Sequence, residues 1–144
     1  MYEKILVPVD GSEHSLNALK HAVTLAKVHN SEITVISVIE ELRLPFGAQY
    51  SLWANESHQE LIRTSLESIN KVITAIKQKE PELLIDSEII EGEPAKTIVK
   101  TAEMNNCSLI VMGKRGMGFI EELIMGTVTH KVVNTSKVPV TIVV

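Results

Sequence analysis

The sequence predicts an α/β fold: an open, five-stranded parallel sheet with helices on both faces. Five short runs rich in valine and isoleucine alternate with four segments whose apolar residues recur every three or four positions. Such alternation favours right-handed crossovers and a parallel sheet. The chain of 144 residues keeps one composition throughout, which predicts a single domain over residues 1–144. We expect the strand order 3-2-1-4-5, which is usual for such folds.

The first predicted strand covers residues 3–9, a short β-branched run that suits a strand buried on both faces. A helix follows, with Ser12 as its N-cap, and ends at Asn30. The next strand covers residues 33–39. Pro8 conflicts with a central strand because it lacks an N–H, so we expect it near the strand's carboxyl end.

The remaining elements are predicted from the spacing of apolar residues and from the positions of turn residues and prolines. The expected elements are a loop at 40–57 leading into a helix at about 55–79, a strand at 83–90, a helix from Pro94, a strand at 108–113, a glycine-bearing loop, a short helix at 127–135 and a last strand at 138–144.

Composition excludes several classes of function. The net charge is −4 and aromatic residues make up 3%, which disfavours a nucleic-acid partner or a membrane surface. The amino-terminal residues do not resemble a signal peptide, and no apolar run approaches the roughly 18 residues of a membrane span. A lone cysteine, Cys107, permits no internal disulfide and suits the reducing cytoplasm.

The strongest chemical signal follows the fourth predicted strand. Residues 113–116 read GKRG, and nine residues later Gly126 and Thr127 open a helix. Glycines let the backbone approach a ligand, and a helix N-terminus supplies free N–H groups and partial positive charge. Lys114 and Arg115 add charge, so the segment predicts a phosphate site. The alternative is an ordinary loop that uses glycine for its turns, and the pattern is not a Walker A loop.

Two further positions lie where ligands bind in open parallel sheets, beyond the carboxyl ends of the strands. Asp10 could bond ribose hydroxyls or a metal on phosphates, or it could cap the first helix. Val38 could flank a base, or it could be a core valine. A zinc site is not expected because no ligand spacing connects the five histidines, which are His14, His21, His29, His58 and His130.

These motifs together resemble the universal stress protein family, over nearly the whole chain. The matching segments are ILVPVDGSEHS at 5–15, EGEPAKTIV at 91–99, IVMGKRGMG at 110–118, GTV at 126–128 and VPVTIVV at 138–144. The spacing of Gly113, Gly116, Gly126 and Thr127 matches the family's nucleotide-binding signature and resembles its ATP-binding members.

The resemblance implies a stress-response regulatory protein that binds ATP, ADP or AMP, with Mg²⁺ on the phosphates near Asp10, and acts through an unknown protein partner. It also implies a homodimer through the last strand, Val140 to Val144. Lys114 departs from the small polar residue common at that place, and Glu121 and Glu122 add negative charge to the spacer. The implied nucleotide-binding residues are Pro8, Val9, Asp10, Val38, Met112, Gly113, Arg115, Gly116, Gly126, Thr127 and Val128.

An enzyme that hydrolyses ATP slowly remains the alternative function. Lys114 and Arg115 could stabilise a transferring phosphoryl group, but no residue in the sequence is evidently placed to orient water. We therefore expect binding without efficient catalysis and assign no catalytic residue. A phospho-accepting receiver domain is discarded. Such a domain needs several acidic residues at its strand ends, and only Asp10 is present here.

Overall fold

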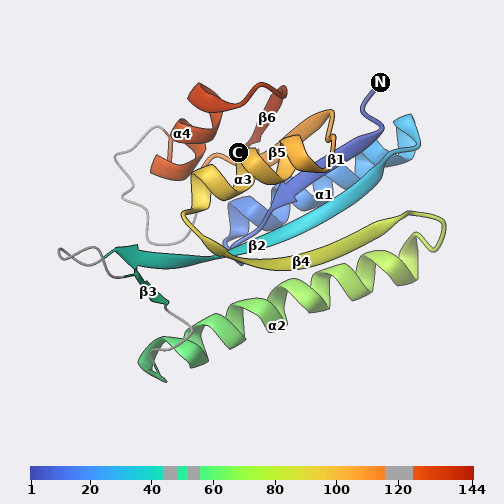
Figure 1. Ribbon diagram of the computed structural model, residues 1–144. Helices are drawn as coiled ribbons and strands as arrows, with labels where there is room; N and C mark the ends of the chain where they lie inside the picture. The colour runs from blue at the N-terminus through green and yellow to red at the C-terminus, as the bar shows by residue number, and fades with distance from the viewer. Residues whose placement is uncertain (44–48, 52–55, 116–124) are drawn as a thin grey trace.

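The computed structural model describes residues 1–43, 49–51, 56–115 and 125–144. Its elements, in chain order, are β1 (Lys4–Pro8), α1 (Glu13–His29), β2 (Glu32–Arg43), β3 (Gln49–Ser51), α2 (Glu56–Lys79), β4 (Ile85–Gly92), α3 (Pro94–Met104), β5 (Leu109–Gly113), α4 (Thr127–Thr135) and β6 (Val140–Val143) (Figure 1). Five of the strands are parallel and lie in the order β4-β2-β1-β5-β6. Counted along the chain without β3, this is the expected order 3-2-1-4-5.

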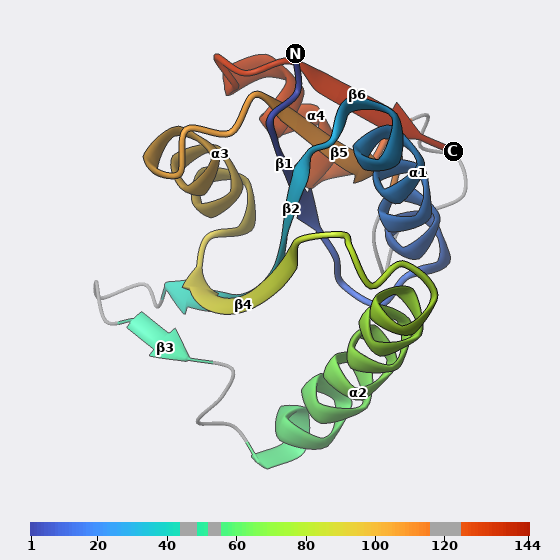
Figure 2. The ribbon, with the colours of Figure 1, turned by 90° about the vertical axis from the view of Figure 1, so that its right-hand side faces the viewer.

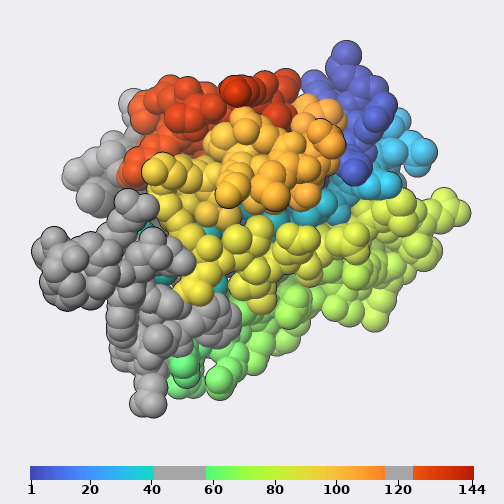
Figure 3. All heavy atoms as spheres, viewed as in Figure 1, coloured from blue at the N-terminus to red at the C-terminus, as the bar shows by residue number. Residues whose placement is uncertain are grey.

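Helices cover both faces of this sheet, as predicted. Figure 2 shows α1 on one side of the central strands and α3 on the other. The core on the first face joins β-strand residues such as Ile5 to Leu19 of α1 and Ile73 of α2. The core on the second face joins Leu6 to Ile98 of α3. Figure 3 shows α3 and α4 side by side on this second face.

The prediction of a loop over residues 40–57 is wrong at its start and in its middle, whereas the helix expected at about 55–79 is confirmed as α2. β2 continues through Arg43, and β3 at Gln49–Ser51 pairs antiparallel with that extension, so the sheet has a sixth strand. Residues 44–48 and 52–55 lie outside the described part of the chain. Residues 41–43 of this extension pair with β3, so antiparallel pairing rather than an apolar pattern sets their strand conformation.

The predicted start and end of the first helix are confirmed. Ser12 is the N-cap of α1, and its Oγ accepts a hydrogen bond from the Ser15 amide at 3.2 Å. Asn30 adopts the left-handed conformation, φ 56°, that commonly terminates helices. Pro8 is the last residue of β1, so its missing N–H falls where the parallel ladder ends.

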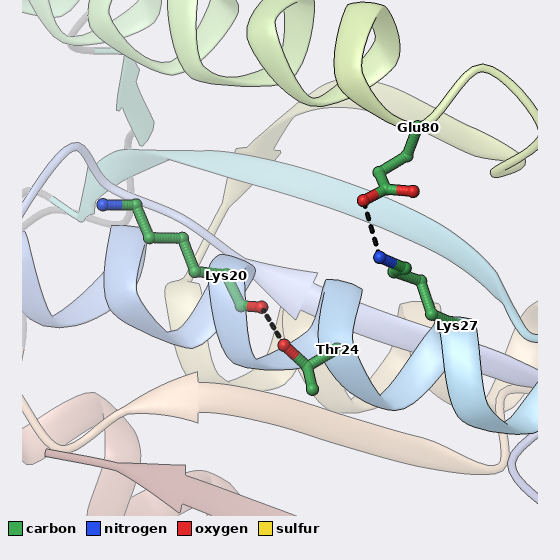
Figure 4. Close-up of polar contacts among 4 residues, drawn as sticks. All are labelled: Lys20, Thr24, Lys27 and Glu80. Carbon is green, nitrogen blue, oxygen red and sulfur yellow. Dashed lines mark hydrogen bonds and ion pairs between the residues drawn. The ribbon is translucent and has the colours of Figure 1, made fainter.

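An ion pair ties the end of α2 to the end of α1. Lys27 Nζ lies 2.7 Å from Glu80 Oε1, and one turn earlier the Thr24 hydroxyl donates to the Lys20 carbonyl at 3.3 Å (Figure 4). The pair bridges 53 residues of sequence at the amino-terminal side of the sheet, away from the carboxyl ends of the strands. Among the described residues, no helix is long and apolar enough to cross a membrane.

Candidate functional site

The carboxyl end of β1 turns sharply into α1 through Asp10 and Gly11. Asp10 Oδ1 accepts a hydrogen bond from the Ser12 amide at 2.9 Å, and the Asp10 amide donates to Ser15 Oγ at 3.3 Å. Gly11 has φ +87°, a conformation that other residues adopt at a cost. Asp10 therefore shapes the turn that precedes α1, but it is not the helix cap that the alternative proposed, because the N-cap is Ser12. The Asp10 side chain is exposed.

The two halves of the glycine pattern are joined by hydrogen bonds. The Gly126 amide donates to the Lys114 carbonyl at 2.9 Å. The buried Thr129 hydroxyl donates to the Gly113 carbonyl, also at 2.9 Å. The first turn of α4 is therefore held directly against the end of β5, next to the half-buried Lys114 and Arg115. Gly116 lies outside the described residues, as do Glu121 and Glu122.

Gly113 packs against α1. A Cβ at this position would lie 2.7 Å from the carbonyl carbon of His14 and 2.9 Å from its oxygen. Backbone atoms cannot be displaced as the end of a flexible side chain can. The glycine is thus required by close strand-to-helix packing, a role that differs from both the ligand access and the loop turn considered from the sequence.

The start of α4 matches the helix expected at 127–135. Gly126 is the N-cap, without a side-chain capping bond, and Thr127 is the first helical residue. Thr127 is exposed at the start of the helix. Val128 is half-buried and packs against the core of the second face. The amides of this first turn have no carbonyl partners within the helix, which favours an anion here.

Two predicted lining residues contribute backbone only. Val9 is 3% exposed and Met112 is 5% exposed, and their side chains belong to the two cores. Pro8 is half-buried at the end of β1. Val38 was expected near the end of its strand, but β2 continues to Arg43, so Val38 lies within β2, two residues beyond Ile36, the partner of Pro8. Val38 is half-buried and packs against the core of the second face, as the core alternative proposed.

No nucleophile or metal cluster emerges among the residues described. Cys107 is buried before β5, at the opposite end of that strand from Gly113, and burial raises the pKa of its thiol. Within the described ranges, no group of three or more His, Cys, Asp or Glu side chains is arranged to hold a metal. The described residues at the ends of β5 and α4 form a candidate cradle for an anion.

Sequence reasoning missed two residues of this cradle, His14 and Thr129. His14 was considered only as a zinc ligand, and Thr129 was not singled out. No local pattern marks either one, because each contacts Gly113 from a helix distant in sequence.

Solved structures share this architecture. The structure of the hypothetical protein MJ0577 from Methanocaldococcus jannaschii is 30% identical, with a TM-score of 0.74, and covers 99% of this chain and 96% of its own. A universal stress protein in complex with cAMP, 22% identical, has a TM-score of 0.64 and coverages of 99% and 96%. One from Archaeoglobus fulgidus in complex with dAMP, 20% identical, has a TM-score of 0.68 and coverages of 99% and 98%. The last two likenesses establish a common fold.

Sequence comparison extends the likeness over the full length. Universal stress protein YxiE of Bacillus subtilis is 35% identical over 147 residues, covering 99% of both chains. Universal stress protein MJ0531 of Methanocaldococcus jannaschii is 34% identical over 146 residues, covering 99% of this chain and 82% of its own. The model of the universal stress protein family matches residues 1–144. With fold, glycine pattern and full-length similarity in agreement, the chain belongs to the universal stress protein family.

Proposed function

We propose that this chain is an ATP-binding regulatory protein, which holds the nucleotide at the carboxyl ends of its parallel strands and acts through a protein partner. One observation carries the proposal: hydrogen bonds from Gly126 and Thr129 hold the start of α4 against Gly113 and Lys114. These bonds bring a helix N-terminus and two cationic residues to one strand end, the arrangement that phosphates prefer. The relatives in complex with cAMP and dAMP support an adenine nucleotide as the ligand.

Each part of the nucleotide has its own proposed contacts. Pro8 and Val38 flank the base and ribose, and the backbone of Val9 and Met112 lines them. Asp10 serves the ribose or a Mg²⁺ ion that arrives with the phosphates, since its side chain is exposed just beyond the carboxyl end of β1. The phosphate contacts are assigned to Gly113, Arg115, Gly116, Gly126, Thr127 and Val128.

Substitutions at the start of α4 test nucleotide binding. Gly126→Val places a branched side chain at the buried N-cap and is expected to abolish ATP binding in calorimetry. Thr127→Ala removes one hydroxyl donor to a charged group and is expected to weaken binding by about 1–2 kcal/mol. Thr135→Ala, the same change in the last turn of α4, is the matched control. Equal ATP affinity in the wild type and Gly126→Val would refute the assignment.

Denaturing the purified protein and identifying the nucleotides that it releases complements this test. ATP, ADP or AMP recovered in near-stoichiometric amount supports the proposal and identifies the resident nucleotide. Recovery of none, together with no calorimetric binding of any of the three, contradicts it.

Slow ATP hydrolysis is the second candidate activity. Lys114 and Arg115 supply cations of the kind that stabilise a transferring phosphoryl group, but no described side chain is assigned to orient water. We therefore place turnover well below the ~1–10³ s⁻¹ of typical enzymes. Turnover above about 1 s⁻¹ that disappears in Asp10→Ala would favour an enzyme instead.

We propose a homodimer through β6, with the nucleotide sites away from the contact. The two edges of the parallel sheet differ: β4 exposes Asp86, Glu88 and Glu91, whereas β6 contains no charged residue. Charges protect an edge from pairing, so β6 is the edge suited to pair with a second copy about a two-fold axis. The lone, buried Cys107 fits a reducing compartment, and we assign the protein to the cytoplasm.

Light scattering across micromolar dilution tests this assembly. The wild type is expected to have a dimer mass, and Thr141→Lys is expected to shift it towards monomer by placing a charge on the β6 edge. Ser87→Lys, the same kind of change on the exposed β4 edge, should leave the dimer intact. A monomer mass for the wild type at every concentration would contradict the proposal.

A further inference from the structure

Lys114 differs from the other lysines of the chain in its burial. All lysines lie within the described residues, and every one except Lys114 is exposed, whereas Lys114 is half-buried. Lysines are rarely covered unless a partner holds the charge. The lysines that form ion pairs in the described part of the chain are Lys27, Lys96 and Lys131. Lys114 is thus partly covered without a carboxylate partner among the residues described.

The ammonium group of Lys114 is open to solvent. In the described ranges, the buried polar side-chain atoms without a partner are His14 Nδ1, Ser31 Oγ and Arg115 Nε. Lys114 Nζ also has no described partner but is not one of these shielded atoms, so solvent reaches it. The covered part of the side chain is therefore its apolar stem, an arrangement typical of lysine. Arg115 already interacts within the chain, so Lys114 is the cation that a ligand can recruit.

The backbone of Lys114 places its side chain on the face of the sheet that carries α4. The Ile110 amide donates to the Pro139 carbonyl at 2.9 Å. Four residues later, the Lys114 amide donates to the Val143 carbonyl at 2.9 Å, so Lys114 continues the register of β5 with β6. Side chains alternate between the two faces of a sheet, so residue 114 shares a face with Ile110, which belongs to the core beneath α3 and α4.

The start of α4 lies beside Lys114 and retains few free donors. The Gly126 amide is engaged by the Lys114 carbonyl. The amides of Thr127 and Val128 follow it in the first turn, where helical amides have no carbonyl partner. Neighbouring amides at one helix end match a single phosphate group. Any further phosphate of a nucleotide needs a cation beyond the helix end.

We propose that Lys114 is a specificity-determining residue for the length of the phosphate chain. The first turn of α4 holds one phosphate, and Lys114 Nζ binds the next, so that ATP and ADP bind more tightly than AMP. This inference rests on the proposed function. Each added phosphate brings negative charge, which a point charge on a flexible stem can follow. AMP gains little from Lys114, because the helix start holds its only phosphate.

Removing the charge of Lys114 while keeping its stem tests this role. By calorimetry at one fixed Mg²⁺ concentration, Lys114→Met should weaken ATP about 10- to 100-fold, the loss of a hydrogen bond to a charged group. It should weaken AMP less than about threefold. Lys114→Arg keeps the positive charge and should hold ATP within about threefold. Lys137→Met, at an exposed lysine before the opposite end of β6, is the matched control for the change in net charge.

The outcomes separate this inference from the proposed function. A wild type that binds neither ATP nor AMP overturns both. A wild type that binds AMP at least as tightly as ATP, or a Lys114→Met variant that weakens both equally or neither, overturns only the role of Lys114. A loss of ATP as large in Lys114→Arg as in Lys114→Met also overturns it, because arginine keeps the charge. Should Lys114→Met fail to fold by circular dichroism, Lys114→Gln replaces it and is judged by the same comparison of ATP with AMP.

Discussion

Gly113→Ala is the sharpest test of how the cradle is built. An added Cβ would lie 2.7 Å from the carbonyl carbon and 2.9 Å from the oxygen of His14, whereas non-bonded carbon atoms prefer about 3.5–4.0 Å. Helix α1 would therefore have to retreat from β5 by about 1 Å. This helix is anchored by Ala18, Leu19 and Ala22, all fully buried, so the retreat disturbs the core of the first face.

Overpacking of this kind costs about 1–3 kcal/mol, and the upper half of that range fits a clash with backbone. With a urea m-value of about 1–3 kcal/mol per molar, the unfolding midpoint of the nucleotide-free protein should fall by about 1 M. Urea titration followed by circular dichroism measures this shift. The measurement is made without nucleotide, so ligand binding does not contribute to it.

The control is Gly92→Ala, at the carboxyl end of β4. Its Cβ would come even closer to a neighbour, 2.6 Å, but that neighbour is Thr97 Oγ1, which rotation about χ1 can move away. We expect a loss below about 1 kcal/mol. If Gly113→Ala leaves the urea midpoint unchanged and only weakens ATP, the packing argument is refuted, and the glycine serves ligand access instead.

Three further changes follow from the described contacts. Thr129→Val removes the hydroxyl that donates to the Gly113 carbonyl, and urea titration should show a free energy of unfolding lower by about 1–2 kcal/mol. An unchanged free energy of unfolding would contradict a stabilising role for this hydrogen bond. Lys27→Met should cost less than about 1 kcal/mol, and the difference should shrink in high salt, because the Lys27–Glu80 pair is partly exposed; a larger or salt-independent cost would contradict this. Burial raises the pKa of Cys107 above its ordinary 9.0, so the thiol should resist a disulfide reagent at neutral pH until the protein unfolds. As pH rises, the thiol ionises in the unfolded chain before it does so in the folded protein. The contribution of the Cys107 thiol to the free energy of unfolding is therefore complete below about pH 9 and is lost as pH rises through the pKa of the folded state. Cys107→Ala should remove this alkaline loss of stability in urea titrations at different pH.

The sequence alone determined the order of the four helices and the five parallel strands, because hydrophobic period and capping are local properties. The Ser12 cap, the Asn30 terminus and the helix at 127–135 all matched, since each depends on residues within one turn. The glycine spacing likewise located the cradle at the end of β5. The end of β2 at residues 41–43 was missed because antiparallel pairing with β3, not residue type, sets its conformation.

Tertiary structure decided what each residue of the cradle does. Val9 and Met112 were expected beside the ligand, but strand alternation and the helices above them direct both side chains into the cores. Gly113 is a glycine because His14, 99 positions earlier, approaches it from α1, and its carbonyl is held by Thr129, 16 positions later. Such contacts depend on how helices pack against the sheet. The spacing of apolar residues within one helix or strand does not specify which distant residues will meet.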